Sequence, residues 1–201
     1  MIRAGRLCLL LAVAGCSVTP SVPPPENLES IYHDRAQRLH GLDDWALLGR
    51  LSIDDSHDGG SGRLHWQRSA NEMQLDFRGS LGQGAWRLRV GPGQARLERG
   101  DGSVTAAESI DELVQAEMGW SVPVEALRWW VLGVAAPGGD DALELDARGR
   151  PIALAQLGWT VRYDRYLPVG DLQLPGRLEA TRGSYRVRLA VKRWTLGAGA
   201  Q

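Results

Sequence analysis

The spacing of apolar residues changes along the chain and separates helical segments from strands. Between Asn27 and Leu42 the apolar residues recur at helical spacing, which predicts a first helix. From Trp45 the period becomes two, and short alternating segments follow one another with Gly-rich turns between them. The alternating apolar positions are Trp45, Leu47, Leu51 and Ile53, then Leu64 and Trp66, then Met73, Leu75 and Phe77, then Trp86, Leu88 and Val90, then Ala95 and Leu97. This pattern predicts an antiparallel meander with one apolar face.

Two helical segments interrupt the strand pattern. Ser109 and Glu112 have the spacing of a capping box, so a helix is expected from there to about Met118. A second helix is expected to begin at Pro123, a favoured first helical residue, and to end at Gly133. Because nearly every position in its last turns is apolar, we expect this helix to meet apolar partners on more than one side.

The strand pattern resumes at Leu143 and ends in a hairpin around residues 182–184. Trp194 falls on the opposite parity from the apolar residues before it, which predicts a β-bulge or a second packing surface. With about eleven strands the sheet should curl, and helices closing it would enclose a cavity. We therefore expect a mainly β fold with α-helices, formed by one domain over residues 28–201.

The N-terminal residues have the pattern of a secretory signal. Basic residues precede an apolar run from Leu7 to Ala14 that is too short to span a membrane permanently. The sequence from Val13 to Cys16 resembles the lipobox of bacterial lipoproteins, where the cysteine sulfur receives a diacylglyceryl group and the chain is cut before it. We expect a signal peptide over residues 1–15 and a lipidated Cys16 carrying acyl chains such as palmitate.

The residues that follow Cys16 predict a tether and a location. Ser17 stands where an Asp would resemble the inner-membrane retention signal of enteric lipoproteins, so we expect the outer membrane, with the domain facing the periplasm. The stretch up to Glu26 is rich in proline and is expected to be extended, without helix. Residues 16–27 are therefore interpreted as a lipidated, semi-rigid tether.

The composition excludes several classes of function. With 23 basic and 24 acidic residues, the chain lacks the basic excess that binds phosphate backbones, so nucleic acid is not expected as a partner. Of its two cysteines, Cys8 lies in the signal peptide and Cys16 is expected to be lipidated, which excludes thiol catalysis and cysteine-ligated metals.

The second face of the meander is polar and is expected to be a solvated convex surface. It carries Arg63, His65, Gln67, Gln74, Asp76, Arg78, Arg87, Arg89 and Arg96.

Two stretches resemble chemical sites but have simpler explanations. Asp54, Asp55, His57 and Asp58 could suggest a metal or catalytic cluster, yet they lie in a polar segment from Asp54 to Gly62 that is typical of a solvated turn. The glycines between residues 79 and 84 do not have the spacing of a dinucleotide fingerprint. No nucleophile stands beside a base. We therefore expect no catalytic residues, no metal, no cofactor and no enzyme activity.

Several motifs in order along the chain resemble the LolB family, the outer-membrane lipoproteins that accept other lipoproteins from the periplasmic carrier LolA. The motifs are Trp45–Arg50, Leu81–Gly82, Gly119, Pro123–Gly133, Gln156–Trp159 with Tyr163, and Trp194. The resemblance implies an unclosed antiparallel β-barrel of about eleven strands, with a helical lid over an apolar cavity that holds acyl chains. It implies that the protein inserts lipoproteins into the outer membrane. It also implies LolA, acylated lipoprotein cargo and outer-membrane lipid as partners of what we expect to be a monomer.

Two sets of candidate site residues follow. Large rings on the sheet and the lid helix could line an acyl-chain cavity, although each is also an ordinary core residue. The candidates are Trp66, Phe77, Trp86, Trp130, Trp159 and Tyr163. Leu81 stands alone among glycines and polar residues in a hairpin turn, where it could enter lipid or fold back onto the sheet. The resemblance matches this turn to the protruding loop that the LolB family uses at the membrane.

Two other functions stay open at this point. A lipid-anchored structural or scaffolding module of the cell envelope would have the same anchor but a filled sheet core. An envelope hydrolase would need rigid, clustered acid and base groups, which the sequence does not offer. A cavity is the feature that separates the receptor from the scaffold.

Overall fold

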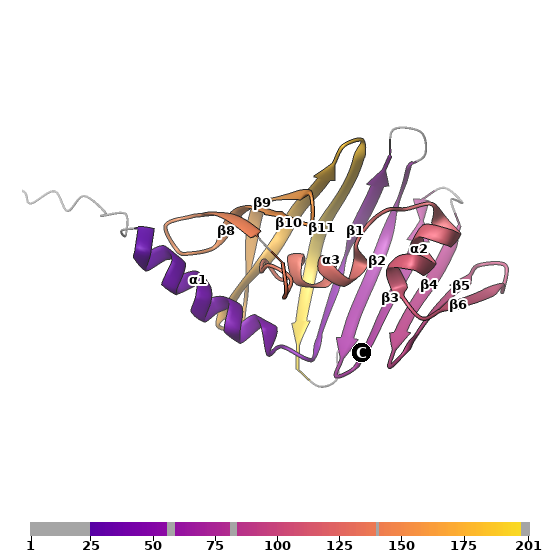
Figure 1. The fold of residues 1–201 in the computed structure, drawn as a ribbon. Coiled ribbons are helices and arrows are strands. Elements are labelled where there is room, and N and C mark those ends of the chain that lie inside the picture. The colour runs from indigo at the N-terminus through magenta and orange to yellow at the C-terminus, as the bar shows by residue number, and fades with distance from the viewer. Residues whose placement is uncertain (1–24, 56–58, 81–83, 140, 198–201) are drawn as a thin grey trace, which may run out of the picture.

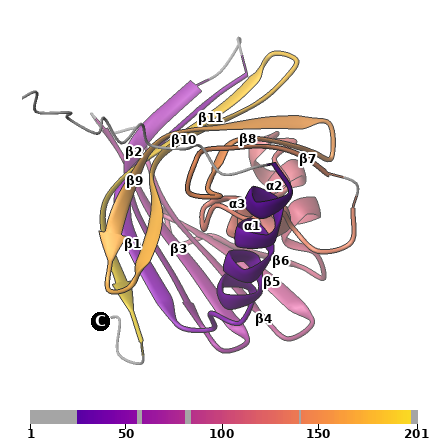
Figure 2. The same ribbon diagram turned by 90° about the vertical axis from the view of Figure 1, so that its left-hand side faces the viewer.

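The computed structural model of the chain describes residues 25–55, 59–80, 84–139 and 141–197. In these residues one antiparallel sheet of eleven strands wraps around three helices (Figures 1 and 2). The strand order is β6-β5-β4-β3-β2-β1-β11-β10-β9-β8-β7, so the edge strands β6 and β7 are not paired with each other. The barrel is unclosed, and the chain passes from one edge strand to the other through two helices, as the sequence predicts.

The elements follow the sequence pattern closely. The helices are α1 (Pro25–His40), α2 (Ile110–Met118) and α3 (Val124–Trp130). The strands are β1 (Trp45–Asp54), β2 (Gly59–Ser69), β3 (Glu72–Gly79), β4 (Ala85–Gly91), β5 (Gln94–Arg99), β6 (Val104–Ala107), β7 (Asp141–Leu145), β8 (Pro151–Gln156), β9 (Trp159–Val169), β10 (Leu172–Arg182) and β11 (Tyr185–Leu196). No helix among the described residues is long and apolar enough to cross a membrane.

Several boundaries differ from the sequence prediction. The helix α3 ends at Trp130, so the expected end at Gly133 is wrong. The helix α1 begins at Pro25, so the expectation that the chain is extended through Glu26 is wrong at its end, because proline is well tolerated in the first helical turn. The predicted turn from Asp54 to Gly62 is too long, since Asp54 already pairs with Gly59 in the β1–β2 ladder. The strand β6 has no counterpart among the predicted strands: it is four residues long and its one large apolar residue, Val104, is exposed.

A β-bulge brings Trp194 into the core, as its parity predicts. In the β1–β11 ladder Gly49 pairs with Val191 while Leu48 pairs with Arg193, which leaves Lys192 as the extra residue. Val191 and Trp194 are consequently both buried. At this point the strands approach so closely that a Cβ on Gly49 would lie 2.6 Å from the carbonyl oxygen of Ala190. Only glycine fits there.

The helix α3 lies across the concave side of the sheet and is buried nearly all round (Figure 2). Its second apolar side meets the C-terminal end of α1. There the His40 and Trp129 rings make an edge contact, with their centroids 4.9 Å apart. The expectation that α3 needs partners on more than one side is confirmed.

Candidate functional site

The six aromatic candidates fall into two regions of the concave face. Trp66, Trp130 and Trp159 are at most 1% exposed, and Tyr163 is also buried. These four, with α3 above them, form what we call the closed region. Phe77 and Trp86 lie toward the other edge of the sheet and border a hollow.

Hydrogen bonds lock the closed region around one buried amide. The Trp130 indole Nε1 donates to Gln156 Oε1 at 2.9 Å, and the backbone N–H of Ala136 donates to the same oxygen at 2.8 Å. Gln156 Nε2 donates in return to the carbonyl of Ala136 at 2.8 Å. The Tyr163 hydroxyl donates to the carbonyl of Trp130 at 3.0 Å, and burial raises the pKa of Tyr163 well above its usual value. These bonds fix both the end of α3 and the segment after it on the sheet.

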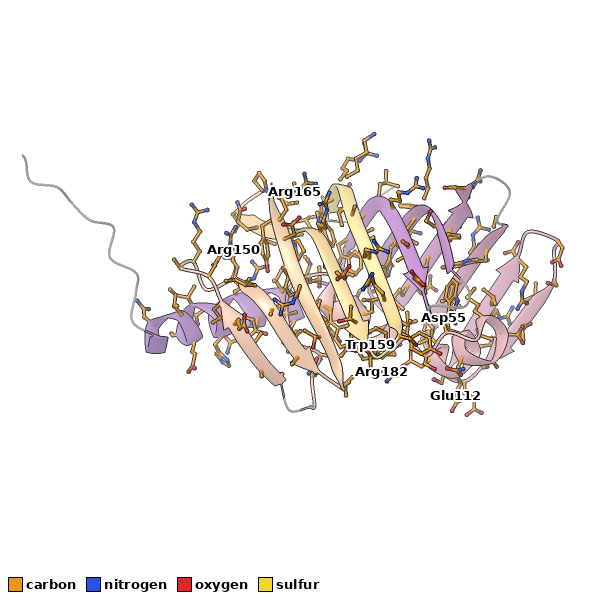
Figure 3. The ribbon with its side chains drawn as sticks, turned by 90° about the horizontal axis from the view of Figure 1, so that it is seen from above. Asp55, Glu112, Arg150, Trp159, Arg165 and Arg182 are labelled. Carbon is orange, nitrogen blue, oxygen red and sulfur yellow. The ribbon has the colours of Figure 1, made fainter. Side chains whose placement is uncertain are left out.

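Packing alone holds the other two indoles of the closed region. Among the described residues the Nε1 atoms of Trp66 and Trp159 have no hydrogen-bond partner. The guanidinium of Arg182 lies over the Trp159 ring, 5.1 Å from its centroid, and Figure 3 shows the two residues side by side. Arg182 also donates to the carbonyl of Ser121 at 3.2 Å, which ties the α2–α3 connection to β10.

The hollow, of about 560 Å³, lies at the end of the sheet where β3 ends and β4 begins. Its wall is a set of aromatic rings: Phe77 and Trp86 are stacked with centroids 5.0 Å apart, and the edge of Trp120 meets Trp86 at 6.1 Å. Met118 adds a flexible apolar side chain at the end of α2. We call this the mouth hollow. Arg99 and Asp101 stand among its otherwise apolar and glycine lining. A space of this size with a few polar groups suits a ligand with an apolar body.

An ion pair holds α2 beside the mouth hollow. Arg99 faces the concave side, directly opposite Trp86 in the β4–β5 ladder. Its Nη2 donates to the Glu117 carboxylate at 2.5 Å and to the Glu117 carbonyl at 3.0 Å. A charged group with this many partners can stand at the edge of an apolar hollow because its hydrogen bonds compensate for lost water.

A single carboxylate joins the two lid helices. Ser109 caps α2 as predicted and accepts a hydrogen bond from the Glu112 N–H at 3.4 Å. For α3, Asp111 supplies the cap: its Oδ1 accepts from the N–H groups of Val124 at 2.7 Å and Glu125 at 3.3 Å. Burial raises the pKa of Asp111, and these two hydrogen bonds only partly offset that rise.

The other end of the lid is held by α1. Arg35 donates to the carbonyl of Leu132 at 3.1 Å, and the Tyr32 hydroxyl accepts from the N–H of Ala135 at 3.0 Å. Burial lowers the pKa of Arg35, whose guanidinium stands over the Tyr166 ring, 5.6 Å from its centroid. The segment after α3 is therefore fixed from both sides.

The candidate metal cluster finds no counterpart in the described part of the chain. Within that part no group of three or more His, Cys, Asp or Glu residues could hold a metal ion. Asp54 lies at the end of β1, while His57 and Asp58, like Cys16 and Leu81, fall outside the described residues. The roles of Cys16 and Leu81 stay predictions.

The structure adds residues to the site that the pattern of apolar positions did not single out. Trp120 follows the glycine that ends α2, and Met118 closes that helix, so both read as ordinary helix-end residues in sequence. Arg99 occupies an inward position of β5, and that parity is the one signal that could have marked it. Gln156 is the single buried polar residue of the described core, which only the fold reveals.

Comparisons with known proteins place these features in a family. The family model described as "Outer membrane lipoprotein LolB" matches residues 43–194. Curated proteins with the same name are similar over nearly their whole length. The Alkalilimnicola ehrlichii protein is 35% identical, covering 96% of this chain and 98% of that protein, and the Halorhodospira halophila protein is 34% identical, covering 96% and 93%. A solved LolA superfamily protein from Nitrosomonas europaea has a similar fold, with a TM-score of 0.55 at 10% identity over 85% of this chain and 94% of that one.

Proposed function

The chain belongs to the LolB family of outer-membrane lipoproteins, and from that premise we propose that it is a receptor for acylated lipoproteins. It accepts them from a periplasmic carrier of the LolA type and passes them into the outer membrane. The observation that carries the proposal is the mouth hollow, a largely apolar space walled by stacked rings that the described side chains leave open. The receptor binds and releases cargo and makes or breaks no covalent bond.

The mouth hollow receives the acyl chains. Phe77, Trp86, Trp120 and Met118 offer flat and flexible apolar surface, and each buried methylene contributes about 0.8 kcal/mol. Transfer from the carrier then needs no nucleotide, because cargo moves to the site that buries its chains better. Arg99 stands at the edge of the hollow, where a guanidinium can donate to the carbonyl groups that link acyl chains to the cargo.

Two residues outside the described part complete the proposal. Acyl chains on Cys16 hold the receptor at the outer membrane, since several chains on one residue anchor stably. Leu81, in the connection after β3, enters the bilayer and assists release. Support for this placement comes from the topology, because the strands that flank Leu81 carry Phe77 and Trp86 of the mouth hollow.

A transfer assay tests the proposal. Carrier loaded with a lipoprotein is mixed with an unanchored form of this chain, Cys16→Ala behind a cleavable secretory signal, with and without ATP. We expect cargo to move to the receptor at the same rate in both conditions. If no cargo moves, the receptor function is wrong, and a strict need for ATP would contradict transfer driven by burial.

Leu81→Glu separates acceptance from release. A carboxylate is costly in hydrocarbon, so the variant should accept cargo as the wild type does and deliver it poorly to liposomes. Equal delivery by both would remove Leu81 from the mechanism, and loss of acceptance would place Leu81 in the binding site.

The lipid-anchored scaffold draws its support from the closed region, which is filled. A scaffold with a filled core would take up no lipopeptide. Binding of a diacylated lipopeptide to the unanchored form, measured by calorimetry, therefore separates the two functions.

A further inference from the structure

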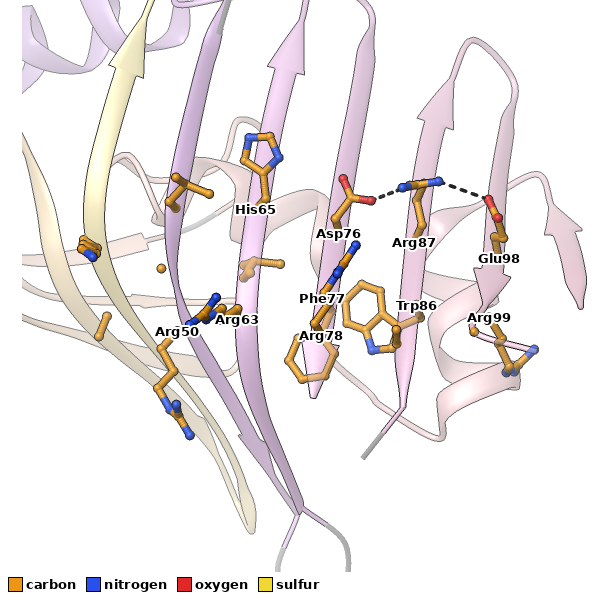
Figure 4. A pocket seen from close by; sticks show the side chains of 17 residues that line it. Arg50, Arg63, His65, Asp76, Phe77, Arg78, Trp86, Arg87, Glu98 and Arg99 are labelled. Carbon is orange, nitrogen blue, oxygen red and sulfur yellow. Dashed lines mark hydrogen bonds and ion pairs between the residues drawn. The ribbon is translucent and has the colours of Figure 1, made fainter. Parts of the chain in front are cut away.

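Three arginines stand directly opposite one another on the convex outer face of the sheet. Arg50 of β1 pairs with Arg63 of β2, and Arg63 pairs with Arg78 of β3, as Figure 4 shows. All three side chains are exposed. Strands lie about 4.8 Å apart, so the three cations follow one another over about 10 Å. We call this set the arginine row.

The neighbouring set of cross-strand residues shows that the arginine row is a specific feature. Two residues further along each strand, His65 pairs with Asp76, Asp76 with Arg87, and Arg87 with Glu98. There the charges alternate and form ion pairs, drawn as dashed lines in Figure 4. Burial would raise the pKa of Asp76, but hydrogen bonds from Gln74 and Arg87 outweigh it and lower that pKa. Alternating charge stabilises a sheet, whereas like charges directly opposite destabilise it.

The arginine row makes no ion pair with the carboxylates that the structure describes. Among the described residues no carboxylate lies within ion-pair distance of Arg50, Arg63, Arg78 or the neighbouring Lys192. Arg50 is instead held by hydroxyl groups, with its Nη2 donating to Ser61 Oγ at 3.1 Å and Ser80 Oγ at 3.0 Å. All four cations line a hollow of about 800 Å³ on the outer face. Asp76 and Glu98 line it as well, but both are paired with Arg87. Like charges that pair with no described carboxylate favour the binding of an external anion.

The position of the arginine row identifies the anion. Arg78 precedes Leu81 by three residues, and three residues of chain span at most about 10 Å. If Leu81 enters the hydrocarbon, Arg78 is held near the depth of the lipid phosphates. On the concave side, the chain from Glu108 to Leu127 has five carboxylates and no Lys or Arg. Two of these carboxylates, Glu117 and Glu125, pair with Arg99 and Arg128. An anionic surface is therefore attracted most strongly to the outer face.

We propose that the arginine row and Lys192 form a docking surface for the phosphate headgroups of anionic membrane phospholipids. This surface orients the receptor so that the mouth hollow opens toward the bilayer during release. The proposal rests on the receptor function for its purpose, but the docking itself does not depend on cargo.

A vesicle sedimentation experiment tests the docking surface. The unanchored Cys16→Ala form is suitable because every residue of the core cluster lies between Ala36 and Trp194. It is mixed with vesicles of phosphatidylethanolamine alone or with added phosphatidylglycerol. The row variant is Arg50→Gln/Arg63→Gln/Arg78→Gln. The matched control is Arg89→Gln/Arg96→Gln/Arg148→Gln, which removes the same charge from exposed arginines elsewhere in the described chain.

The wild type should bind the phosphatidylglycerol vesicles more tightly, and high salt should abolish the difference. Each lost cation near an anionic surface weakens binding about fivefold, so the row variant should bind roughly 100-fold more weakly. The affinity of the control variant should stay within about twofold of wild type. In the docked orientation its charges should lie more than one screening length, about 8–10 Å, from the lipid headgroups. The thermal midpoint of the row variant should be no lower than that of wild type, because the substitutions remove repulsion.

Equal binding of the row variant and the wild type to phosphatidylglycerol vesicles would overturn the proposal. So would a row variant that binds vesicles normally but no longer accepts cargo from the carrier, because the arginine row would then face a protein. Leu81→Glu separates insertion of Leu81 into the hydrocarbon from docking of the arginine row on anionic headgroups. Its effect on vesicle binding should persist on vesicles without phosphatidylglycerol. The effect of the row variant should vanish on those vesicles. If the wild type failed to accept cargo in the transfer assay, the receptor function would be wrong. The vesicle experiment would still test the docking surface.

Discussion

The closed region and the mouth hollow are built from the same kinds of residue on the same concave face, yet they differ in how their rings are held. In the closed region Trp130 has no exposed surface and its indole nitrogen bonds the buried Gln156. At the mouth hollow Trp86 is only partly buried, and its described partners are other rings. A ring whose polar atom is bonded and whose surface is covered serves the fold. A ring that borders an unfilled space is available to a ligand.

Truncation of a ring in the closed region should have the largest effect on stability. Trp130→Ala should lower the free energy of unfolding by about 3–5 kcal/mol, because it opens a cavity and removes a buried hydrogen bond. Urea denaturation of the unanchored form measures this. A loss under about 1 kcal/mol would mean that the closed region is as loose as the mouth hollow.

Removing the amide that locks the closed region should have the next largest effect. Gln156→Leu keeps most of the volume but leaves the Trp130 indole N–H and the Ala136 N–H and carbonyl without partners, which should cost about 2–3 kcal/mol. The same urea titration checks it. Gln67→Leu, on the outer face, is the matched control and should change the free energy of unfolding by less than about 0.5 kcal/mol.

At the mouth hollow, truncating a ring should weaken ligand binding more than it lowers stability. Trp86→Ala and Trp120→Ala should each lower the unfolding free energy by no more than about 2 kcal/mol, since these rings are only partly buried. Their affinity for a diacylated lipopeptide should fall about tenfold, because a large flat contact is lost. Calorimetric titration measures the affinity, with Val104→Ala as a control on an exposed edge residue. Unchanged affinity in both Trp variants would place the acyl chains elsewhere.

The sequence could predict most strands and the helices because local pattern and global fold agree. The capping residue Ser109 marks a helix start, and the parity of Trp194 allows a bulge or a second packing surface, of which the structure has the bulge. The sequence could not separate Trp66 from Trp86, because both alternate in the same way along neighbouring strands. Their difference depends on what the lid covers, and that is decided by contacts between residues far apart in the chain, such as Arg182 with Ser121.

Acid should act mildly on the turn between β7 and β8. In the β7–β8 turn burial would raise the pKa of Asp146, but hydrogen bonds from Arg150 and from the backbone outweigh it and lower that pKa. A carboxyl with a lowered folded-state pKa contributes stability above its unfolded pKa of about 3.9 and loses it as the pH falls through the folded value. Asp146→Asn should therefore cost less than about 1 kcal/mol at neutral pH and remove part of the acid sensitivity. Thermal melts from pH 7 down to pH 3 would check this, and an unchanged pH profile would contradict it.

The most direct measurement of the central claim is photo-crosslinking of bound cargo. A diacylated lipopeptide with a photoreactive group on one acyl chain is bound to the unanchored form, irradiated, and mapped by mass spectrometry. The account predicts adducts on Phe77, Trp86, Met118 and Trp120, which line the mouth hollow. Adducts confined to the outer face of the sheet, or to Trp130 and Trp159, would contradict it.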